Sequence, residues 1–194
     1  MDIIPLIYIE NGVLLMSRNG EQLSTDELFQ RVQKDTMLYI LDIDGIEHDN
    51  PQLDLYQKLS DHCILWVDAG PRMLDDVMDI IMAGATNITV REELWPAIDI
   101  LGILDITEGE TYLAVDPQQQ ETTIELSLLK KIAGIVIFND ENQMTTDFNS
   151  WRFLKEGITK PKIYLYDIPS MNMSYWEERG VTGILVDLKK KEGV

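Results

Sequence analysis

Several aspartates of this chain stand directly after short apolar runs, where a strand would end and a loop begin. They are Asp42, Asp68, Asp116, Asp167 and Asp187. Side chains alternate between the two faces of a strand, so the first four each share a face with apolar residues two and four positions earlier. Carboxylates that meet at one end of a sheet can act as general acid and base, or hold a cation that relieves their repulsion. Each aspartate could equally accept backbone N–H groups or cap the next helix, and both interpretations stay open.

Eight short apolar runs alternate with seven amphipathic stretches. The runs, which predict strands, are Ile3–Ile9, Met37–Leu41, Cys63–Val67, Asn87–Val90, Thr111–Val115, Gly134–Phe138, Lys162–Tyr166 and Gly183–Val186. The predicted helices are Thr25–Lys34, Pro51–Leu59, Leu74–Met82, Leu94–Leu101, Thr122–Ile132, Phe148–Lys155 and Met173–Arg179. This alternation is typical of an α/β fold around a parallel sheet. It predicts a compact (β/α)8 TIM barrel, one domain over residues 1–194, whose last helix is missing or reduced to residues 188–194.

A weak internal repeat favours a closed barrel over the alternative, an open doubly wound sheet. Segment 83–90, AGATNITV, is similar to segment 179–186, RGVTGILV, and each copy follows a strand end that carries an aspartate. Two similar halves of four strands are what duplication of a half-barrel leaves. Capping residues stand before three predicted helices, at Ser24, Asn50 and Asp147.

Three segments resemble the HisA/HisF family, the histidine-biosynthesis barrels that bind ribonucleotides with two phosphates. Residues 3–12, IIPLIYIENG, are similar to the family's IIPxIDLxDG opening, and residues 38–45, LYILDIDG, to its second strand, LHLVDLDG. Residues 67–72, VDAGPR, with Ala83-Gly-Ala85 after the next helix, resemble the family's GGGIR and EAGA. The Asp-Ala-Gly motif at residues 68–70 resembles the corresponding motif in a divergent HisA-related branch of archaea and methylotrophs. That resemblance implies a role in one-carbon metabolism with methanopterin-type cofactors.

The catalytic pair of the family is only half present. The resemblance implies an acid and a base at the ends of strands 1 and 5, which in the family are both aspartates. Asp116 keeps the second, but Tyr8 stands at the first. A phenol with a pKa near 10 can donate a proton but is a poor base at neutral pH. We therefore expect Asp116 and Tyr8 to be the catalytic residues of a reaction other than the histidine-pathway isomerisation.

The phosphate-binding turns have also changed. Strands 7 and 8 of such barrels end in glycine-rich turns, whereas Asp167 with Pro169 and Asp187 follow the corresponding runs here. Proline offers no N–H group and the carboxylates repel anions, so we exclude a bisphosphate ribonucleotide as substrate. If the resemblance sets the inward face, Asp42, Asp68, Asp116 and Asp167 converge at the C-terminal mouth of the barrel. The expected substrate-binding residues are Asp42, Asp68, Gly70, Arg72, Asn139 and Asp167.

Composition narrows the partners of the protein. The 194 residues carry a formal charge of −18, which excludes binding to nucleic acid through a basic surface that neutralises its phosphates. No apolar run has the roughly 20 residues of a membrane span, and the start of the chain lacks the basic residues of a signal peptide. The single cysteine, Cys63, fits a reducing compartment, so we expect a cytoplasmic protein.

Three functions remain open at this stage. The first is an enzyme of one-carbon or pterin-type metabolism acting on a small molecule. The second is a HisA-like pseudoenzyme that serves as a subunit or regulator, and the third is a metal-dependent barrel enzyme that uses the aspartates. The sequence assigns no cofactor and no metal ligand, and it leaves open a homo- or hetero-oligomer.

Overall fold

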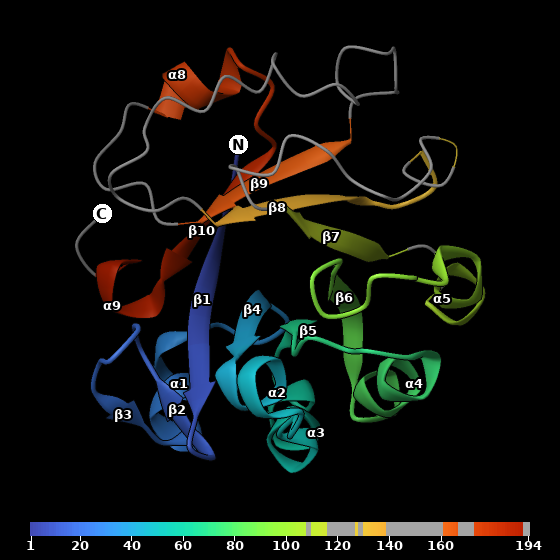
Figure 1. Cartoon of the computed structure of the whole chain (residues 1–194). Helices are drawn as coiled ribbons and strands as arrows, with labels where there is room; N and C mark the ends of the chain where they lie inside the picture. Colours follow the sequence, from blue (N-terminus) through green and yellow to red (C-terminus); the bar gives the residue numbers. More distant parts are fainter. Residues whose placement is uncertain (108–109, 116–126, 128–129, 139–160, 167–172, 192–194) are drawn as a thin grey trace.

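The chain forms a closed parallel β-barrel, the compact (β/α)8 TIM barrel that the sequence predicts (Figure 1). This computed structural model describes residues 1–107, 110–115, 127, 130–138, 161–166 and 173–191. Within these residues, eight parallel strands make the barrel: β1 (Asp2–Glu10), β4 (Met37–Asp42), β5 (Ile64–Asp68), β6 (Ala85–Arg91), β7 (Thr111–Val115), β8 (Gly134–Phe138), β9 (Lys162–Tyr166) and β10 (Gly183–Asp187). Each corresponds to one of the predicted apolar runs.

Closure of the barrel depends on the first strand. β1 pairs in parallel with β4, from Leu6 opposite Tyr39, and with β10, from Asp2 opposite Gly183. The predicted pairing of the first and last strands is therefore confirmed, and the open doubly wound sheet is wrong. The internal repeat has a structural counterpart, because Gly84 and Gly180, at the second position of each copy, have φ of +103° and +84°. Glycine tolerates this conformation because it lacks a Cβ atom.

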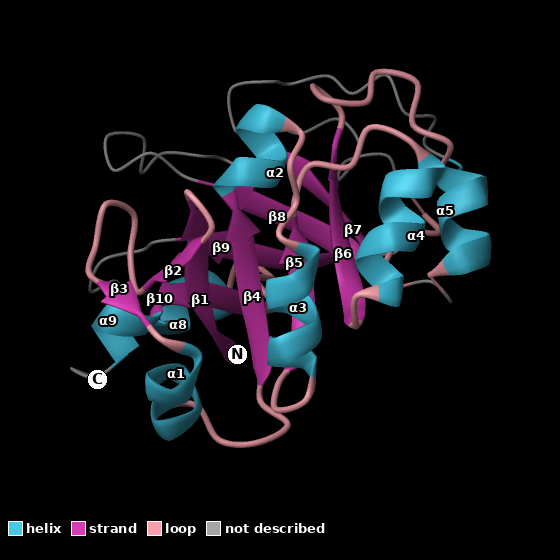
Figure 2. Ribbon diagram, turned by 90° about the horizontal axis from the view of Figure 1, so that it is seen from below, coloured by secondary structure: helices cyan, strands magenta, loops and turns pink. Residues whose placement is uncertain are grey.

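The described helices lie outside the barrel strands (Figure 2). They are α1 (Thr25–Arg31), α2 (Ile43–His48), α3 (Leu53–Ser60), α4 (Leu74–Met82), α5 (Ile100–Ile106), α8 (Met173–Glu177) and α9 (Leu188–Lys191). The short α9 confirms the reduced last helix. Ser24 caps α1 with a reciprocal bond to Glu27, as predicted. None of the described helices is long and apolar enough to cross a membrane.

Two predicted helix starts are wrong. The helix expected over Leu94–Leu101 is α5, which begins at Ile100, because Pro96 interrupts the earlier stretch and Asp99 caps the Gly102 N–H at 2.9 Å. The helix expected from Pro51 begins at Leu53. Gln52 lies before the helix, and its backbone N–H donates a hydrogen bond to the Asp42 carboxylate. Most of Thr122–Ile132, and all of Phe148–Lys155 with its cap Asp147, lie outside the described residues.

Two elements were not predicted. A hairpin, β2 (Val13–Leu15) with β3 (Gln22–Leu23), extends β1 beyond the barrel. The six-residue α2 directly follows β4, and it is too short to show a helical period in the sequence. Asp44 in α2 accepts the N–H groups of Asn11 and Gly12 at 2.8 Å each, so it fixes the turn between β1 and β2.

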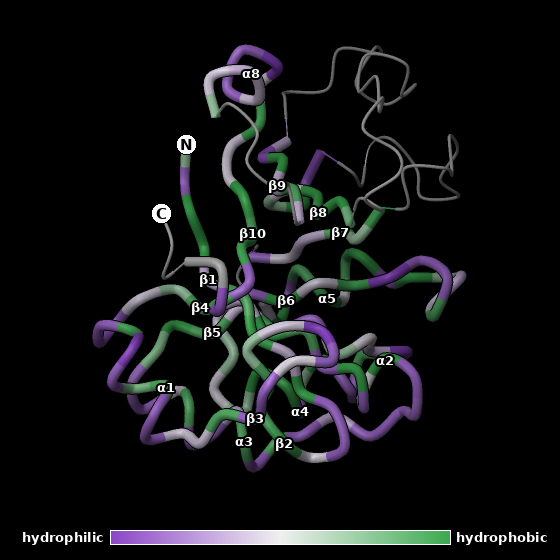
Figure 3. The backbone as a smooth tube through the Cα atoms, turned by 90° about the vertical axis from the view of Figure 1, so that its left-hand side faces the viewer, coloured by the Kyte–Doolittle hydropathy of each residue, from purple (hydrophilic) through white to green (hydrophobic). Residues whose placement is uncertain are grey.

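The buried side chains form two apolar layers, one on each side of the barrel wall. The outer layer joins Ile40, Val67 and Leu165 to helix residues such as Val77 and Ile103. The inner layer fills the barrel with large side chains, among them Ile4, Leu6, Tyr8, Tyr39, Trp66, Tyr112, Val136, Tyr164 and Leu185. Because both faces of the barrel strands are largely buried, hydrophobicity alone does not tell which face points inward. Hydropathy colouring likewise shows the strands as largely apolar (Figure 3).

Candidate functional site

A buried ion pair lies inside the barrel near the C-terminal ends of β5 and β6. Asp68 is completely buried, and Arg91 donates to both of its carboxylate oxygens, Nε to Oδ1 at 2.9 Å and Nη2 to Oδ2 at 2.7 Å. The Tyr39 hydroxyl donates to Oδ2 at 3.0 Å and also contacts Thr89. Asp68 therefore faces inward as predicted, but its charge is matched by a guanidinium in two-point geometry.

Arg91 is held by more than its carboxylate partner. Its guanidinium lies 5.1 Å above the centre of the Phe138 ring, and Nη1 reaches Glu93 at 3.3 Å. Burial opposes the charged form, but Asp68 outweighs this effect, so the pKa of Arg91 is raised. The guanidinium is consequently a fixed positive charge at the mouth, oriented before any ligand arrives.

A second polar cluster joins three neighbouring strands on the opposite part of the mouth. The Tyr8 hydroxyl donates to Asp187 Oδ1 at 3.1 Å, the Tyr166 hydroxyl reaches the same atom at 3.2 Å, and the two hydroxyl groups contact each other. Burial, then the Tyr166 hydrogen bond and the Asp187 charge, raise the pKa of Tyr8 far above its ordinary value. Tyr8 therefore stays protonated at any physiological pH and can donate a hydrogen bond but not accept a proton as a base.

Aromatic rings connect the two clusters. The Phe138 and Tyr166 rings lie 5.5 Å apart between centres, and Tyr8 meets the edge of Tyr166 at 6.5 Å. Arg91, Phe138 and Tyr166 are each partly exposed, whereas Tyr8, Asp68 and Asp187 beneath them are buried. We call the three partly exposed residues the mouth row. The row places a guanidinium, two aromatic rings and a phenol next to one another, with the Asp68 and Asp187 carboxylates behind them.

Asp42 does not join this mouth, and the prediction that it faces the barrel interior is wrong. Tyr39 and Leu41 of β4 point inward, which turns Ile40 and Asp42 toward the helices. The Asp42 carboxylate accepts the N–H groups of Gly45 and Gln52 at 3.0 and 2.8 Å and a hydrogen bond from the Tyr56 hydroxyl. Burial raises the pKa of Asp42 although these hydrogen bonds oppose the shift. Asp42 thus caps α2 and ties it to α3.

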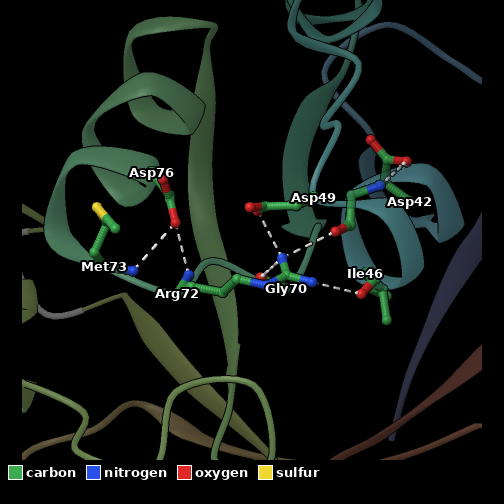
Figure 4. Close-up of polar contacts among 8 residues, drawn as sticks. Asp42, Ile46, Asp49, Gly70, Arg72, Met73 and Asp76 are labelled. Atoms are coloured by element: carbon green, nitrogen blue, oxygen red, sulfur yellow. Dashed lines mark hydrogen bonds and ion pairs between the residues drawn. The ribbon is translucent and has the colours of Figure 1, made fainter.

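Gly70 and Arg72 lie after β5 and pack against α2 (Figure 4). Gly70 has φ +62°, and a Cβ atom there would lie 2.5 Å from Leu94 Cδ1. Arg72 donates to the carbonyls of Gly45, Ile46 and Gly70 at 3.0–3.2 Å and to Asp49 at 2.8 Å. It therefore caps the C-terminal carbonyls of α2, and an anion could bind its terminal nitrogens only in competition with these bonds.

Three expected site residues, Asp116, Asn139 and Asp167, lie outside the described residues. The strand before Asp167 has the opposite orientation from the one expected, because Ile163 and Leu165 face the helices and Tyr164 and Tyr166 face inward. The ring of four converging aspartates is therefore wrong, since Asp42 points away from the barrel axis. Across the described ranges, no group of three His, Cys, Asp or Glu side chains could hold a metal ion.

Sequence reasoning missed Arg91, Phe138 and Tyr166. A signal for Arg91 was present, because it is the only basic residue between Arg72 and Lys130 and it directly follows an apolar run. A lone cation at a strand end within an acidic stretch indicates a buried partner. Phe138 and Tyr166 end their strands as ordinary core residues would, and nothing in their spacing marked them.

Comparison with known proteins does not supply a family for this chain. None of the known family models matches it, and no curated protein gives a significant match.

Proposed function

We propose that this protein is a divergent HisA-like barrel that binds a small planar molecule at its C-terminal mouth. In this proposal it is an enzyme of one-carbon metabolism whose ligand is a reduced pterin of the methanopterin type. The mouth row, Arg91 over Phe138 beside Tyr166, carries the proposal. Aromatic faces and a guanidinium favour a flat conjugated ring system, and the functional groups of barrel enzymes are placed at this end.

The buried groups behind the row give the ligand different hydrogen-bonding partners on its two sides. Asp68 keeps Arg91 in one orientation through two hydrogen bonds, so a ligand meets a pre-ordered cation. Tyr8 and Tyr166 supply phenols polarised by Asp187. Since Tyr8 cannot be the base, we assign the acid–base role to Asp116 on the family resemblance alone.

The same geometry argues against a phosphorylated ligand at the last strand. β10 ends at Asp187, whose buried carboxylate faces the mouth, and α9 begins at the next residue. A carboxylate at this position repels a phosphate, whereas a neutral heterocycle can donate N–H groups to it.

A non-catalytic role is the second candidate, and one observation favours it. Both described inward carboxylates at the mouth, Asp68 and Asp187, accept hydrogen bonds from side chains of the protein itself. A barrel that had become a subunit or regulator would satisfy its former catalytic groups in this way. Such a protein would fold as described here but would bind no pterin at the mouth row.

Calorimetric titration with tetrahydrofolate tests the pterin proposal. We expect binding to the wild-type protein and a roughly tenfold weaker affinity for Phe138→Leu, which removes a stacking surface. Phe29→Leu is the matched control, because Phe29 stacks on His62 in the α1 region rather than at the mouth. Absence of binding, or equal affinities for wild type and Phe138→Leu, would refute the pterin ligand and favour the non-catalytic candidate.

We also expect that this chain does not replace the histidine-pathway isomerase. Tyr8 stands where the family resemblance requires a carboxylate, and its raised pKa removes the base from that reaction. The measurement is growth without histidine of a strain that lacks the isomerase and expresses this protein. Growth at a rate similar to that of the complemented control strain would contradict this prediction. It would show that the chain catalyses the isomerisation without an aspartate at position 8.

A further inference from the structure

The outer faces of α4 and α5 expose several large apolar side chains. Met78 and Met82, one turn apart on α4, are 45% and 78% exposed, and Leu101 on α5 is 48% exposed. The two helices lie side by side (Figure 2), and a Cβ atom on Gly102 would lie 2.8 Å from Leu74 Cδ1. The exposed side chains thus belong to one surface formed by two adjoining helices.

Acidic residues share this surface. Asp75 and Asp79 lie on the same stripe of α4 as the two methionines, at spacings of three and four residues, and Asp105 follows Leu101 by one turn. All three aspartates are exposed. From residue 74 to residue 107 the only basic residue is Arg91, and its guanidinium is turned inward to Asp68. The surface therefore combines an apolar stripe with a negative rim of three exposed aspartates.

We propose that this acidic methionine face (Asp75, Met78, Asp79, Met82, Leu101 and Asp105) binds a basic amphipathic helix of another protein. Unbranched, polarisable methionine side chains adapt to an apolar helix face, and the aspartates pair with flanking Lys or Arg residues. A second copy of this chain fits poorly, because each copy carries a formal charge of −18 and the same negative rim. This inference is independent of the barrel mouth and of the pterin proposal.

The test uses a synthetic helical peptide made only of Leu and Lys, with leucines at helical spacing. A second peptide has the same composition, reordered so that its helix has no apolar face. By fluorescence anisotropy at physiological salt, we expect the amphipathic peptide to bind better. We expect Met78→Gln/Met82→Gln to weaken its binding about tenfold. The matched control is Met173→Gln, since Met173 is 36% exposed on α8 and should leave the affinity unchanged.

A charge pair of variants completes the test. Asp79→Lys should weaken binding of the amphipathic peptide several-fold more than Glu21→Lys, which changes the net charge equally but lies between β2 and β3. Equal binding of the two peptides, or of the double variant and the wild type, would mean non-specific charge attraction and overturn the proposal. So would a wild-type dimer in analytical ultracentrifugation that Met82→Gln dissociates, because the face would then bind a second copy. Met82→Gln alone keeps the test valid if the double variant unfolds.

Discussion

Replacing Arg91 with methionine should lower the free energy of unfolding by about 3–5 kcal/mol, because it leaves the buried Asp68 carboxylate without its countercharge. Asp68 has no solvent exposure, and after the change Tyr39 would be its remaining donor among the contacts described. A loss of this size is a large part of the roughly 5–15 kcal/mol that stabilises a typical protein. Urea unfolding followed by circular dichroism measures it.

Two further variants separate the ion pair from the packing of the arginine stem. In Asp68→Asn/Arg91→Met no charge is buried, so at least half of the lost stability should return. Arg179→Met removes an exposed arginine that lies over the Tyr175 ring and should cost less than about 1 kcal/mol. If Arg91→Met were no more destabilised than Arg179→Met, the pair would not organise the mouth.

The protein should lose stability steeply above about pH 10, the pKa of tyrosine in an unfolded chain. Burial is the main cause that raises the pKa of the inward or buried phenols Tyr8, Tyr39, Tyr56, Tyr112 and Tyr164. Because the pKa of each buried phenol is higher in the folded state than in the unfolded chain, its full contribution to the free energy of unfolding is present below pH 10. That contribution is lost at higher pH, where the unfolded chain releases the phenol protons. Each such phenol removes about 1.4 kcal/mol per pH unit in that range.

Urea unfolding at several pH values, together with tyrosinate absorbance, measures this effect. The absorbance should rise together with loss of the folded circular dichroism signal. Tyr164 has its pKa raised to about 12, so Tyr164→Phe should make the loss per pH unit smaller without a large change at neutral pH. A rise in tyrosinate absorbance while the protein stays folded would show that these phenols ionise in place.

The barrel strands could be predicted because each is a short apolar run bounded by turn residues, and their order follows from the closed fold. Their inward faces could not be predicted for every strand. In β4 both Tyr39 and Ile40 are buried, Tyr39 inside the barrel and Ile40 beneath the helices. Since both faces of the strand are apolar, the sequence does not show which face points inward. Because the wrong face of β4 was taken as the inward one, Asp42 was predicted to lie at the mouth, whereas it caps α2.

Only part of the candidate site could be predicted from the sequence. Asp68 faces inward as predicted, and Asp187 is buried at the mouth as well. Their partners Arg91 and Tyr166 come from other strands, so only the pairing of β6 and β9 into the barrel reveals them. Acidic residues at strand ends suggested a ring of carboxylates, whereas the described structure pairs Asp68 with a cation and Asp187 with two phenols.

We propose that Arg91, Phe138 and Tyr166 form a ligand-binding surface at the barrel mouth. Nuclear magnetic resonance with ¹³C-labelled tyrosine and phenylalanine rings, recorded against a library of small polar and heteroaromatic fragments, tests it most directly. Planar fragments should shift the ring signals of Phe138 and Tyr166 more than that of Phe29, and Phe138→Leu should abolish the response of Tyr166. Fragments that shift only signals remote from the mouth, or a Tyr166 response that persists in Phe138→Leu, would contradict this account.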